Sequence, residues 1–303
     1  MRNKLILMLV RLLGRLPLGV AQGLGALLGL GMFLWPNRQR EYARINIERC
    51  LPEWTPAQRR RLLRRTLVEN ARTLLEMPAI WRRDPAEVLA RIDDNGGREL
   101  LRRTLQQGKG ALLAAPHLGN WETGIHYLAS VTPTIALYRP PRLEVLDEVI
   151  KGGRSRGGGN LVPTTAGGIK ALYEALQEGQ VVVILPDQQP KAQGKGAGVF
   201  APFFGQPALT MVLLNRLARK TGAPLLYIYM ERLPRARGWR VNLLPAPPGL
   251  DAADPEQAAA ALNLGVEQCV RRCPEQYQWT YKRFEAQPDE GVSPYRRRSR
   301  QRG

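Results

Sequence analysis

The chain has 303 residues, and its 45 Lys and Arg against 26 Asp and Glu give it a net charge of +19. This length allows one large domain or two modest ones, with a sizeable core. The charge calls for an anionic partner: nucleic acid, an anionic membrane surface, or an acidic protein or substrate. Three cysteines are too few for a disulfide framework and suit a reducing compartment.

The first segment, residues 16–35, contains no charged residue and is flanked on both sides by basic residues. A helix of this length covers about 30 Å, enough to cross the hydrocarbon core of a bilayer. Pro17 interrupts the segment, and its glycines four residues apart allow close helix packing. Residues 1–45 are therefore predicted to form a membrane anchor that either spans the membrane or lies in its interface. The alternative is a buried core helix.

Apolar residues at helical intervals predict a helix over residues 58–75. Beyond it, short apolar runs alternate with helical stretches. The runs predict buried strands at 110–115, 134–138, 181–185, 224–230 and 239–244, and helices are predicted at 169–177, 209–220 and 255–272. This alternation is typical of an α/β fold, with a mostly parallel or mixed central sheet flanked by helices. We expect a catalytic domain over residues 46–290 and a flexible basic tail over 291–303.

The stretch APHLGNWETG, residues 115–124, joins the first predicted strand to a helix that begins at Trp121. It puts His117 at the end of the strand and Glu122 about one turn into the helix. The sequence Pro186–Asp187–Gln188 follows the 181–185 strand in the same way. Reactive groups of such sheets gather beyond the carboxyl ends of the strands, so these side chains are predicted to meet at one edge.

Histidine exchanges a proton near neutral pH and needs its second ring nitrogen held, which a carboxylate can do. Glu122 is predicted to hold His117 if the loop turns back on itself, and the backbone N–H groups near Gly119 and Asn120 are predicted to bind a developing oxyanion. No Ser or Cys nucleophile stands in the motif, which favours direct transfer over a covalent acyl-enzyme. The bare H-x4-E pattern also fits a structural histidine. His126 is predicted to be a packing or surface residue.

Other residues have both a functional and a structural interpretation. Cys269 and Cys273 lie four residues apart, but no further ligand completes a zinc site. No nucleotide-binding glycine motif is present in the sequence, so no cofactor is predicted. The basic residues around two glycine-rich stretches either bind phosphate or are solvated charges: Arg154, Arg156, Lys191 and Lys195. The stretch 189–204 is predicted to be a long loop, either functional or disordered.

Several ordered blocks resemble one family. HLGNWE at 117–122, YRP at 138–140, LPDQ at 185–188, VFAPFFGQPALT at 199–210 and QWTYKRFE at 278–285 occur in this order in the late acyltransferases of lipid A biosynthesis. These are the lauroyl/myristoyl transferases of the lysophospholipid-acyltransferase superfamily. NIERCLPEWT at 46–55 and EGVSPYRRR at 290–298 resemble its flanking segments, so the match covers nearly the whole chain.

The resemblance implies an enzyme at the cytoplasmic face of the bacterial inner membrane. It would move a fatty acyl group from acyl carrier protein, its thioester co-substrate, to a hydroxyl of an anionic glucosamine-based glycolipid. His117 would be the general base and Glu122 its orienting partner. Arg139 would bind anionic groups of the acceptor or of the donor's phosphopantetheine, and Asp187 and Gln188 would fix the substrate or the loop.

Alternatives to this interpretation remain. Arg139 and Asp187 form a structural ion pair in one of them. The apolar side chains Trp121, Phe203 and Phe204 either line an acyl groove or belong to the core. The same site could serve another glycolipid acceptor or hydrolyse a lipid ester or thioester. Nucleic-acid binding is not expected, because only 7% of the residues are aromatic and several of these lie in apolar runs.

Overall fold

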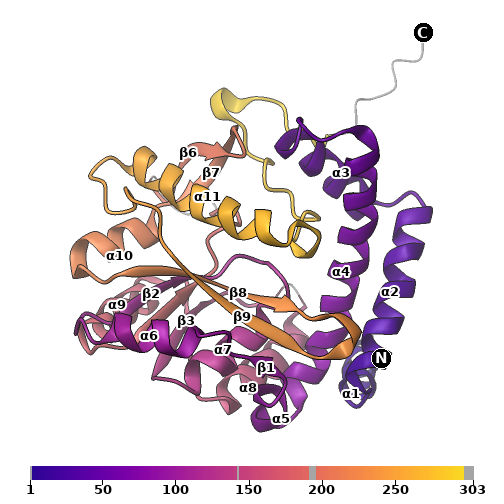
Figure 1. Cartoon of the computed structure of the whole chain (residues 1–303), viewed down its shortest axis with the longest axis horizontal. Coiled ribbons are helices and arrows are strands. Elements are labelled where there is room, and N and C mark those ends of the chain that lie inside the picture. The colour runs from indigo at the N-terminus through magenta and orange to yellow at the C-terminus, as the bar shows by residue number, and fades with distance from the viewer. Residues whose placement is uncertain (1, 142, 191–195, 297–303) are drawn as a thin grey trace.

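A computed structural model describes residues 2–141, 143–190 and 196–296 (Figure 1). Its described part contains a seven-stranded sheet in the order β1-β9-β8-β2-β5-β3-β4. All neighbouring strands of this sheet are parallel except β8 and β9, which pair antiparallel. The strands are β1 (Ile92–Asp93), β2 (Ala111–Ala114), β3 (Thr134–Tyr138), β4 (Gly159–Pro163), β5 (Val181–Ile184), β8 (Leu225–Arg232) and β9 (Trp239–Pro245). The predicted mixed α/β sheet is confirmed.

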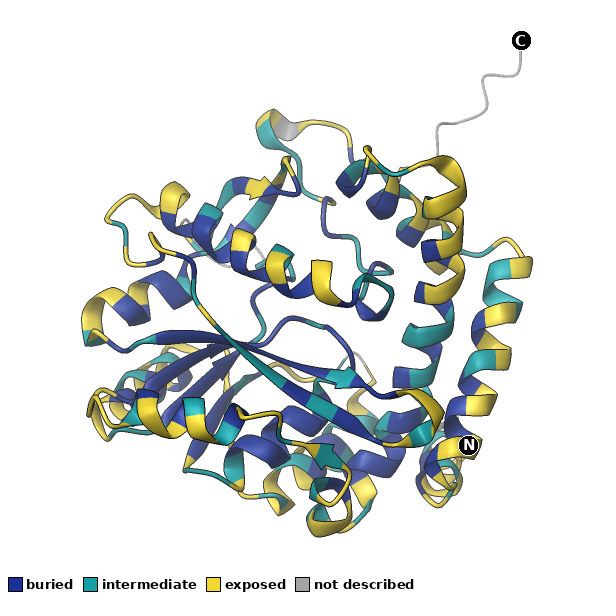
Figure 2. Ribbon diagram, viewed as in Figure 1, coloured by how far each residue is buried: buried dark blue, intermediate teal, exposed yellow. Residues whose placement is uncertain are grey.

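Helices pack against both faces of this sheet, which is why its central strands are continuously apolar. Every residue of β2 and β5 is buried. Leu112 and Ala114 of β2 point into one core cluster with α9 (Ala166–Gln177), α10 (Leu213–Thr221) and α11 (Pro255–Arg272). Ala111 and Leu113 point into the other, because side chains alternate along a strand. That second cluster includes side chains of α5 (Pro85–Leu89), α6 (Gly97–Leu105) and α7 (Glu122–Ala129), and Figure 2 shows the buried sheet between exposed outer helix faces.

The N-terminal part is helical: α1 (Arg2–Gly14), α2 (Leu18–Leu34), α3 (Arg38–Cys50) and α4 (Pro56–Arg82). Helix α2 lies along α4 at very short range. A Cβ atom added to Gly25 would lie 2.6 Å from the Arg72 Cα, and one added to Gly29 would lie 2.4 Å from the Val68 Cα. Gly25 and Gly29 therefore form a packing seam on one face of α2, whereas Leu27 and Leu34 on this helix are about two-thirds exposed.

Within the described residues, no single helix is long and apolar enough to be a membrane span. Helices α2 and α3 meet the criteria together, but they are bent by 78° where they join. The alternative of a buried core helix also fits α2 only in part, since large apolar side chains remain exposed on it. The N-terminal anchor thus stays a prediction.

Two segments differ from prediction. Residues 209–220, predicted as one helix, are divided between the end of strand β7 (Gln206–Met211) and helix α10. Strand β6 (Gly198–Phe203) occupies the end of the predicted loop 189–204 and forms an antiparallel hairpin with β7. Phe204 and Gly205 make its two-residue turn, both with positive φ. Pro202 and Pro207 make this hairpin difficult to predict from the sequence, because proline is uncommon inside strands.

Helix α8 (Asp147–Arg156) was not predicted, and its sequence DEVIKGGRSR contains two glycines. Gly153 allows it to approach α4 closely: a Cβ there would lie 2.7 Å from the Trp81 Cα. Lys191, Lys195 and residues 297–303 of the predicted tail lie outside the described residues.

Candidate active site

His117 and Asp187 meet because two neighbouring strands end side by side. β2 and β5 pair in parallel, with Ala114 opposite Ile184, and each chain then leaves the sheet at the same edge. His117 follows β2 by three residues and Asp187 follows β5 by three residues. The predicted convergence of the two polar stretches at one sheet edge is confirmed.

Asp187 holds His117 at two points. Its Oδ1 lies 2.8 Å from Nδ1 of the imidazole, and its Oδ2 accepts the backbone N–H of His117 at 2.9 Å. Burial alone would raise the pKa of the Asp187 carboxyl, but the charge and hydrogen bonds of His117 hold it below the usual value. Asp187 is therefore ionised, and its Oδ1 is placed to accept the N–H of Nδ1, which leaves Nε2 as the ring nitrogen that can accept a proton.

The other ring nitrogen, Nε2, faces Gln188. The Gln188 side-chain Nε2 lies 3.2 Å from it and also donates to Oε1 of Gln278 at 3.1 Å. Trp121 packs edge-on against the imidazole, with ring centroids 4.9 Å apart. The side chain of His117 is 13% exposed, and the Gln188 amide occupies the position in front of Nε2.

The predicted partner of His117, Glu122, lies in a different pair. Its Oε1 accepts from Nη2 of Arg154 at 2.6 Å, and its Oε2 accepts from Arg154 Nε and from the Trp81 indole N–H. Burial would raise the pKa of this carboxyl, but the charge and hydrogen bonds of Arg154 keep it below the usual range. The prediction that Glu122 holds the His117 ring is wrong, because the first residue of α7 faces α8 and α4.

The loop between His117 and Glu122 is fixed by its backbone. Gly119 has φ of +65°, and a Cβ there would lie 1.8 Å from the Met230 carbonyl oxygen. The Gly119 N–H donates to the Gln276 carbonyl and the Asn120 N–H to the Met230 carbonyl. Asn120 is fully buried. The N–H groups of Gly119 and Asn120 themselves are therefore not available to an oxyanion, since both donors are used inside the fold.

The predicted arginines fall into two groups. Arg154 is bound to Glu122, and exposed Arg156 donates to the backbone oxygen of Trp81. Arg139 is exposed, and no ion pair joins it to Asp187 within the described residues, where the aspartate bonds His117 instead. Arg139 lies close enough to Tyr281 for its charge to act on the pKa of that phenol. Of the three predicted arginines, Arg139 is the one available to bind an anion near the site.

An apolar cavity lies beside the pair. Trp121 and Arg154 line it, together with side chains from the strands and helix α7: Ala115, Ile125, Leu128, Ala136, Leu137, Val183, Leu185, Ile228, Tyr229 and Met230. Trp121 thus lines an apolar space, as one alternative predicted. Phe203 and Phe204 do not line this cavity, because they pack in the core with Tyr277, Trp279 and Phe284; Phe203 borders the smaller cavity next to Asp187.

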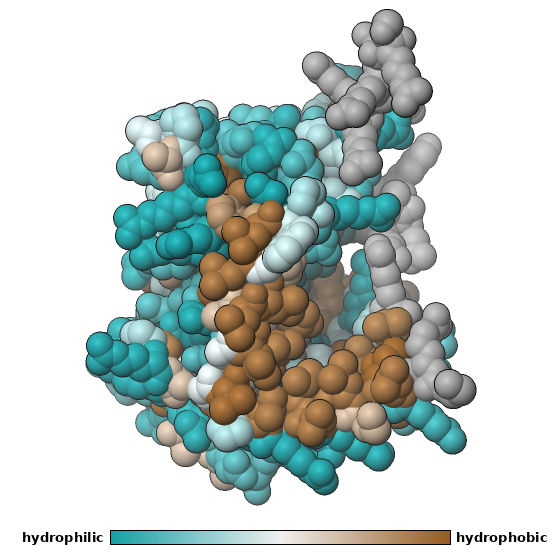
Figure 3. Space-filling model, turned by 90° about the vertical axis from the view of Figure 1, so that its right-hand side faces the viewer, coloured by the Kyte–Doolittle hydropathy of each residue, from teal (hydrophilic) through white to brown (hydrophobic). Residues whose placement is uncertain are grey.

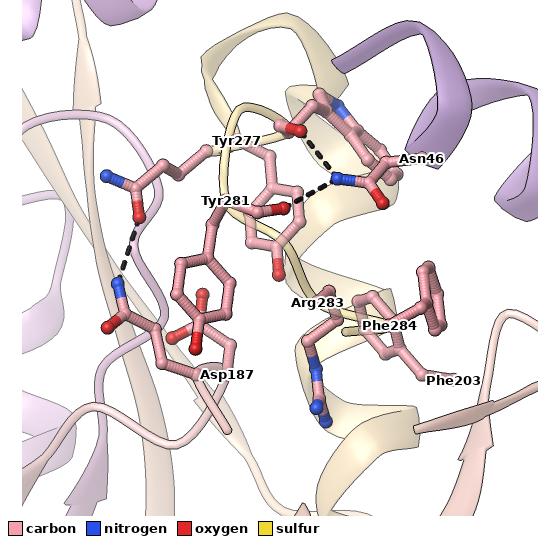
Figure 4. Close-up of a pocket in the computed structure, with 10 residues that line it drawn as sticks. Asn46, Asp187, Phe203, Tyr277, Tyr281, Arg283 and Phe284 are labelled. Carbon is pink, nitrogen blue, oxygen red and sulfur yellow. Dashed lines mark hydrogen bonds between the residues drawn. The ribbon is translucent and has the colours of Figure 1, made fainter. Parts of the chain in front are cut away.

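The opposite side of Asp187 is formed by the C-terminal block QWTYKRFE. A cavity of about 10 Å³ is lined by Asp187 and Gln188, by Tyr277 just before this block, and by Tyr281 and Arg283 within it (Figure 4). Arg283 is buried, which lowers its pKa, and it donates to the Leu209 carbonyl and to Thr210. No role was predicted for these residues. Their only signal in the sequence was the motif QWTYKRFE itself, preceded by Tyr277.

The remaining candidates take no part in this geometry. His126 is 1% exposed, and neither of its ring nitrogens has a hydrogen-bond partner among the described residues, so it is a packing residue. The three cysteines are free and buried, and desolvation raises the pKa of each thiol.

These features define an α/β acid–base site: a histidine–aspartate pair at the carboxyl edge of a mixed sheet, beside an apolar cavity. The family of bacterial lipid A biosynthesis acyltransferases matches residues 3–286. The chain belongs to this family of acyltransferases, which confirms the resemblance seen in its motifs.

Three similar proteins are also named as acyltransferases. The lipid A biosynthesis lauroyltransferase of Escherichia coli (strain K12) is 31% identical over 93% of this chain and 90% of its own length. The palmitoleoyltransferase of the same organism is 28% identical over 90% and 88%. A phosphatidylinositol mannoside acyltransferase of Mycobacterium tuberculosis is 31% identical over 64% and 59%.

Proposed function

We propose that the protein transfers a fatty acyl chain from the thioester of acyl carrier protein to a hydroxyl of a lipid A precursor. His117 is the general base, Asp187 orients it, and no acyl-enzyme forms. The observation that carries this proposal is the hydrogen bond of 2.8 Å between His117 Nδ1 and Asp187, which leaves Nε2 as the proton acceptor.

The reaction needs one base and no metal or nucleotide. The acceptor hydroxyl replaces the Gln188 amide at Nε2, gives its proton to the imidazole and attacks the thioester carbonyl. An oxygen–carbon bond forms, the carbon–sulfur bond breaks, and the imidazolium returns the proton to the leaving thiolate. The Asp187 carboxylate stabilises the imidazolium while it exists. Gln188 is placed to hold Nε2 until the substrate arrives.

The surroundings suit these substrates. The cavity beside Trp121 offers an apolar environment to an acyl chain next to the base. Exposed Arg139 suits a phosphate of the donor's prosthetic group or of the acceptor. The net charge of +19 favours association with an acidic carrier protein and a phosphorylated lipid.

A lipid acceptor also suits the N-terminal helices. One broad apolar area covers the α1–α2 side of the molecule (Figure 3). Its large exposed side chains are Leu5, Met8, Leu9 and Leu12 of α1, Val20, Leu24, Leu27, Leu28, Leu30 and Leu34 of α2, and Trp35. Leucines with a tryptophan and nearby arginines are typical of a face that lies in a membrane interface. We propose that this face binds the cytoplasmic surface of the inner membrane.

Vesicle flotation tests the membrane contact. Wild-type protein should float with vesicles that contain anionic lipid, and Leu27→Glu combined with Leu34→Glu should remain at the bottom of the gradient. Equal flotation of both proteins would contradict binding through α2.

An acyl-transfer assay tests the activity. Purified protein receives acyl carrier proteins charged with chains of ten to sixteen carbons and a phosphorylated lipid A precursor, and mass spectrometry follows the lipid. Wild-type protein should add one acyl chain, and His117→Gln should abolish the gain. His126→Gln is the matched control, because it makes the same change at a packing histidine and should keep the activity wherever the variant is folded.

Other outcomes identify other reactions. Free fatty acid without a heavier lipid would make the protein a hydrolase. Transfer to a mannosylated phosphatidylinositol instead of the lipid A precursor would assign a different glycolipid acceptor, as the name of the mycobacterial relative suggests. Full activity of His117→Gln would exclude this histidine as the base.

A further inference from the structure

A buried ionic cluster lies behind the loop that carries His117. Glu76 of α4 is fully buried and receives two hydrogen bonds from Arg232, at 2.7 and 2.9 Å. Arg232 is also buried and binds Glu69, about two turns before Glu76 on α4. Burial would raise the pKa of Glu76, but the charge and hydrogen bonds of Arg232, with bonds from Asn120 and Gln22, keep it below the usual value.

Glu76 forms hydrogen bonds with two segments that are far apart in the sequence. Its Oε2 accepts from the Asn120 side-chain amide at 2.6 Å, and its Oε1 accepts from the Gln22 amide of α2 at 2.7 Å. Thr73, one turn earlier on α4, donates to the Gly119 carbonyl at 3.1 Å. Helix α4 therefore holds the His117 loop at two points, and α2 reaches one of them through a single carboxylate.

Gln22 stands out on its helix. It is a polar side chain only 7% exposed in a segment that is otherwise apolar, and it lies one turn from the Gly25 contact with α4. An unpaired amide at this position would cost roughly 1–3 kcal/mol. The bond to Glu76 therefore depends on the close packing that the glycines allow.

We propose that Gln22 and Glu76 are positioning residues for acyl transfer: the chain Gln22–Glu76–Asn120 sets the place of the His117 loop according to how α2 sits on α4. The helix that presents the apolar face to lipid is thus linked by three side chains to the loop that holds the base. The kinetic part of this proposal rests on the proposed function, whereas the structural link does not.

Two changes test the link from the α2 side. Gln22→Leu removes the amide at similar volume, and Glu76 keeps Arg232. Gly25→Ala forces α2 away from α4, and Gly23→Ala is its matched control, because a Cβ at Gly23 meets nothing within 4 Å. Both alanines change helix propensity equally, so a difference between them reports on the seating of α2.

The first measurement is hydrogen exchange at the amides of Gly119 and Asn120, which bond to the Gln276 and Met230 carbonyls. Gln22→Leu and Gly25→Ala should each speed this exchange about tenfold, the effect of one lost hydrogen bond, and Gly23→Ala should not. Unchanged exchange in both variants, with native melting, would overturn the proposal whether or not the protein transfers acyl groups.

The second measurement separates positioning from general weakening. Gln22→Leu and Gly25→Ala should lower kcat about tenfold and leave KM for both substrates within about twofold, since neither touches substrate. The double variant should be no worse than the worse single variant, because both act through one chain. Additive losses, or a lower melting temperature with normal kcat, would reduce the cluster to a structural role. If wild-type protein shows no transfer, the proposed function fails and the exchange measurement alone decides the link.

Discussion

Asp187 and Glu122 are two carboxylates of similar burial, 3% and 4% exposed, that differ in the cation each one faces. Asp187 faces an imidazole that can gain and lose a proton, and Glu122 faces the guanidinium of Arg154, which stays charged. Both carboxyl pKa values lie below the ordinary range against the effect of burial. The partner, more than the burial, thus decides which carboxylate can assist proton transfer and which holds a fixed charge in place.

The largest effect is expected at the histidine pair. His117→Ala should lower kcat about 10³-fold or more, and Asp187→Asn about 10²- to 10⁴-fold, because the asparagine no longer fixes the tautomer or stabilises the imidazolium. Single-turnover rates on charged carrier protein measure both. Melting temperatures close to wild type are the control for His117→Ala, and a loss smaller than tenfold at Asp187 would leave the aspartate without a role in orienting the base.

Glu122→Gln should act mainly on stability. Arg154 would remain buried without its counter-charge, a change that costs about 3–5 kcal/mol in comparable buried pairs. Differential scanning calorimetry should show a melting point several degrees lower, with kcat reduced about tenfold at temperatures where the variant is folded. Loss of activity as deep as in His117→Ala, with unchanged melting, would instead place Glu122 among the reacting groups.

The pH dependence of stability should report on the buried carboxylates. The folded protein binds protons on Glu122, Asp187 and Glu76 less readily than the unfolded chain does, since all three pKa values are lowered. Their contribution to stability is therefore complete above about pH 4.3, the ordinary glutamate value, and is lost as the pH falls below it. Burial also lowers the pKa of His126, so the melting temperature should fall gradually below about pH 6.5, the ordinary histidine value, and the three carboxylates should add a further decline below about pH 4. Glu122→Gln should make the decline shallower, and an identical slope would contradict the assigned ionisation.

The smallest effect is expected at Arg139, which is exposed and belongs to neither pair. Arg139→Gln should raise KM for one substrate about five- to tenfold and leave kcat within twofold, because a charge–charge contact in solvent is weak and screened. Repeating the measurement at higher salt should narrow the difference between variant and wild type. A salt-independent difference would argue against an anion contact.

Much of the sheet could be predicted from the sequence, because buried parallel strands are continuous apolar runs. The run TIALY matches β3 in full, and the helix predicted over 255–272 matches α11, which begins at the Asp254 cap followed by a proline. The meeting of His117 and Asp187 was also predictable, since it requires only that two parallel strands end at one edge.

The partner of each side chain could not be predicted. Assigning Arg154 to Glu122 requires helix α8, whose glycines weaken its helical pattern but permit its contact with Trp81. The position of Glu122 also depends on the left-handed turn at Gly119, which sends the carboxylate away from the imidazole. Sequence spacing alone places H-x4-E within reach of each other and says nothing of competing partners.

The seam between α2 and α4 has a practical consequence for protein production. Deleting the first 35 residues to obtain a better-behaved catalytic fragment would uncover the α4 surface that Gly25 and Gly29 cover. It would also leave an oxygen of Glu76 without its amide donor at the base of the active-site loop. A soluble version is better sought by replacing exposed leucines such as Leu27 and Leu34 with polar residues, which leaves the glycine face and Gln22 in place.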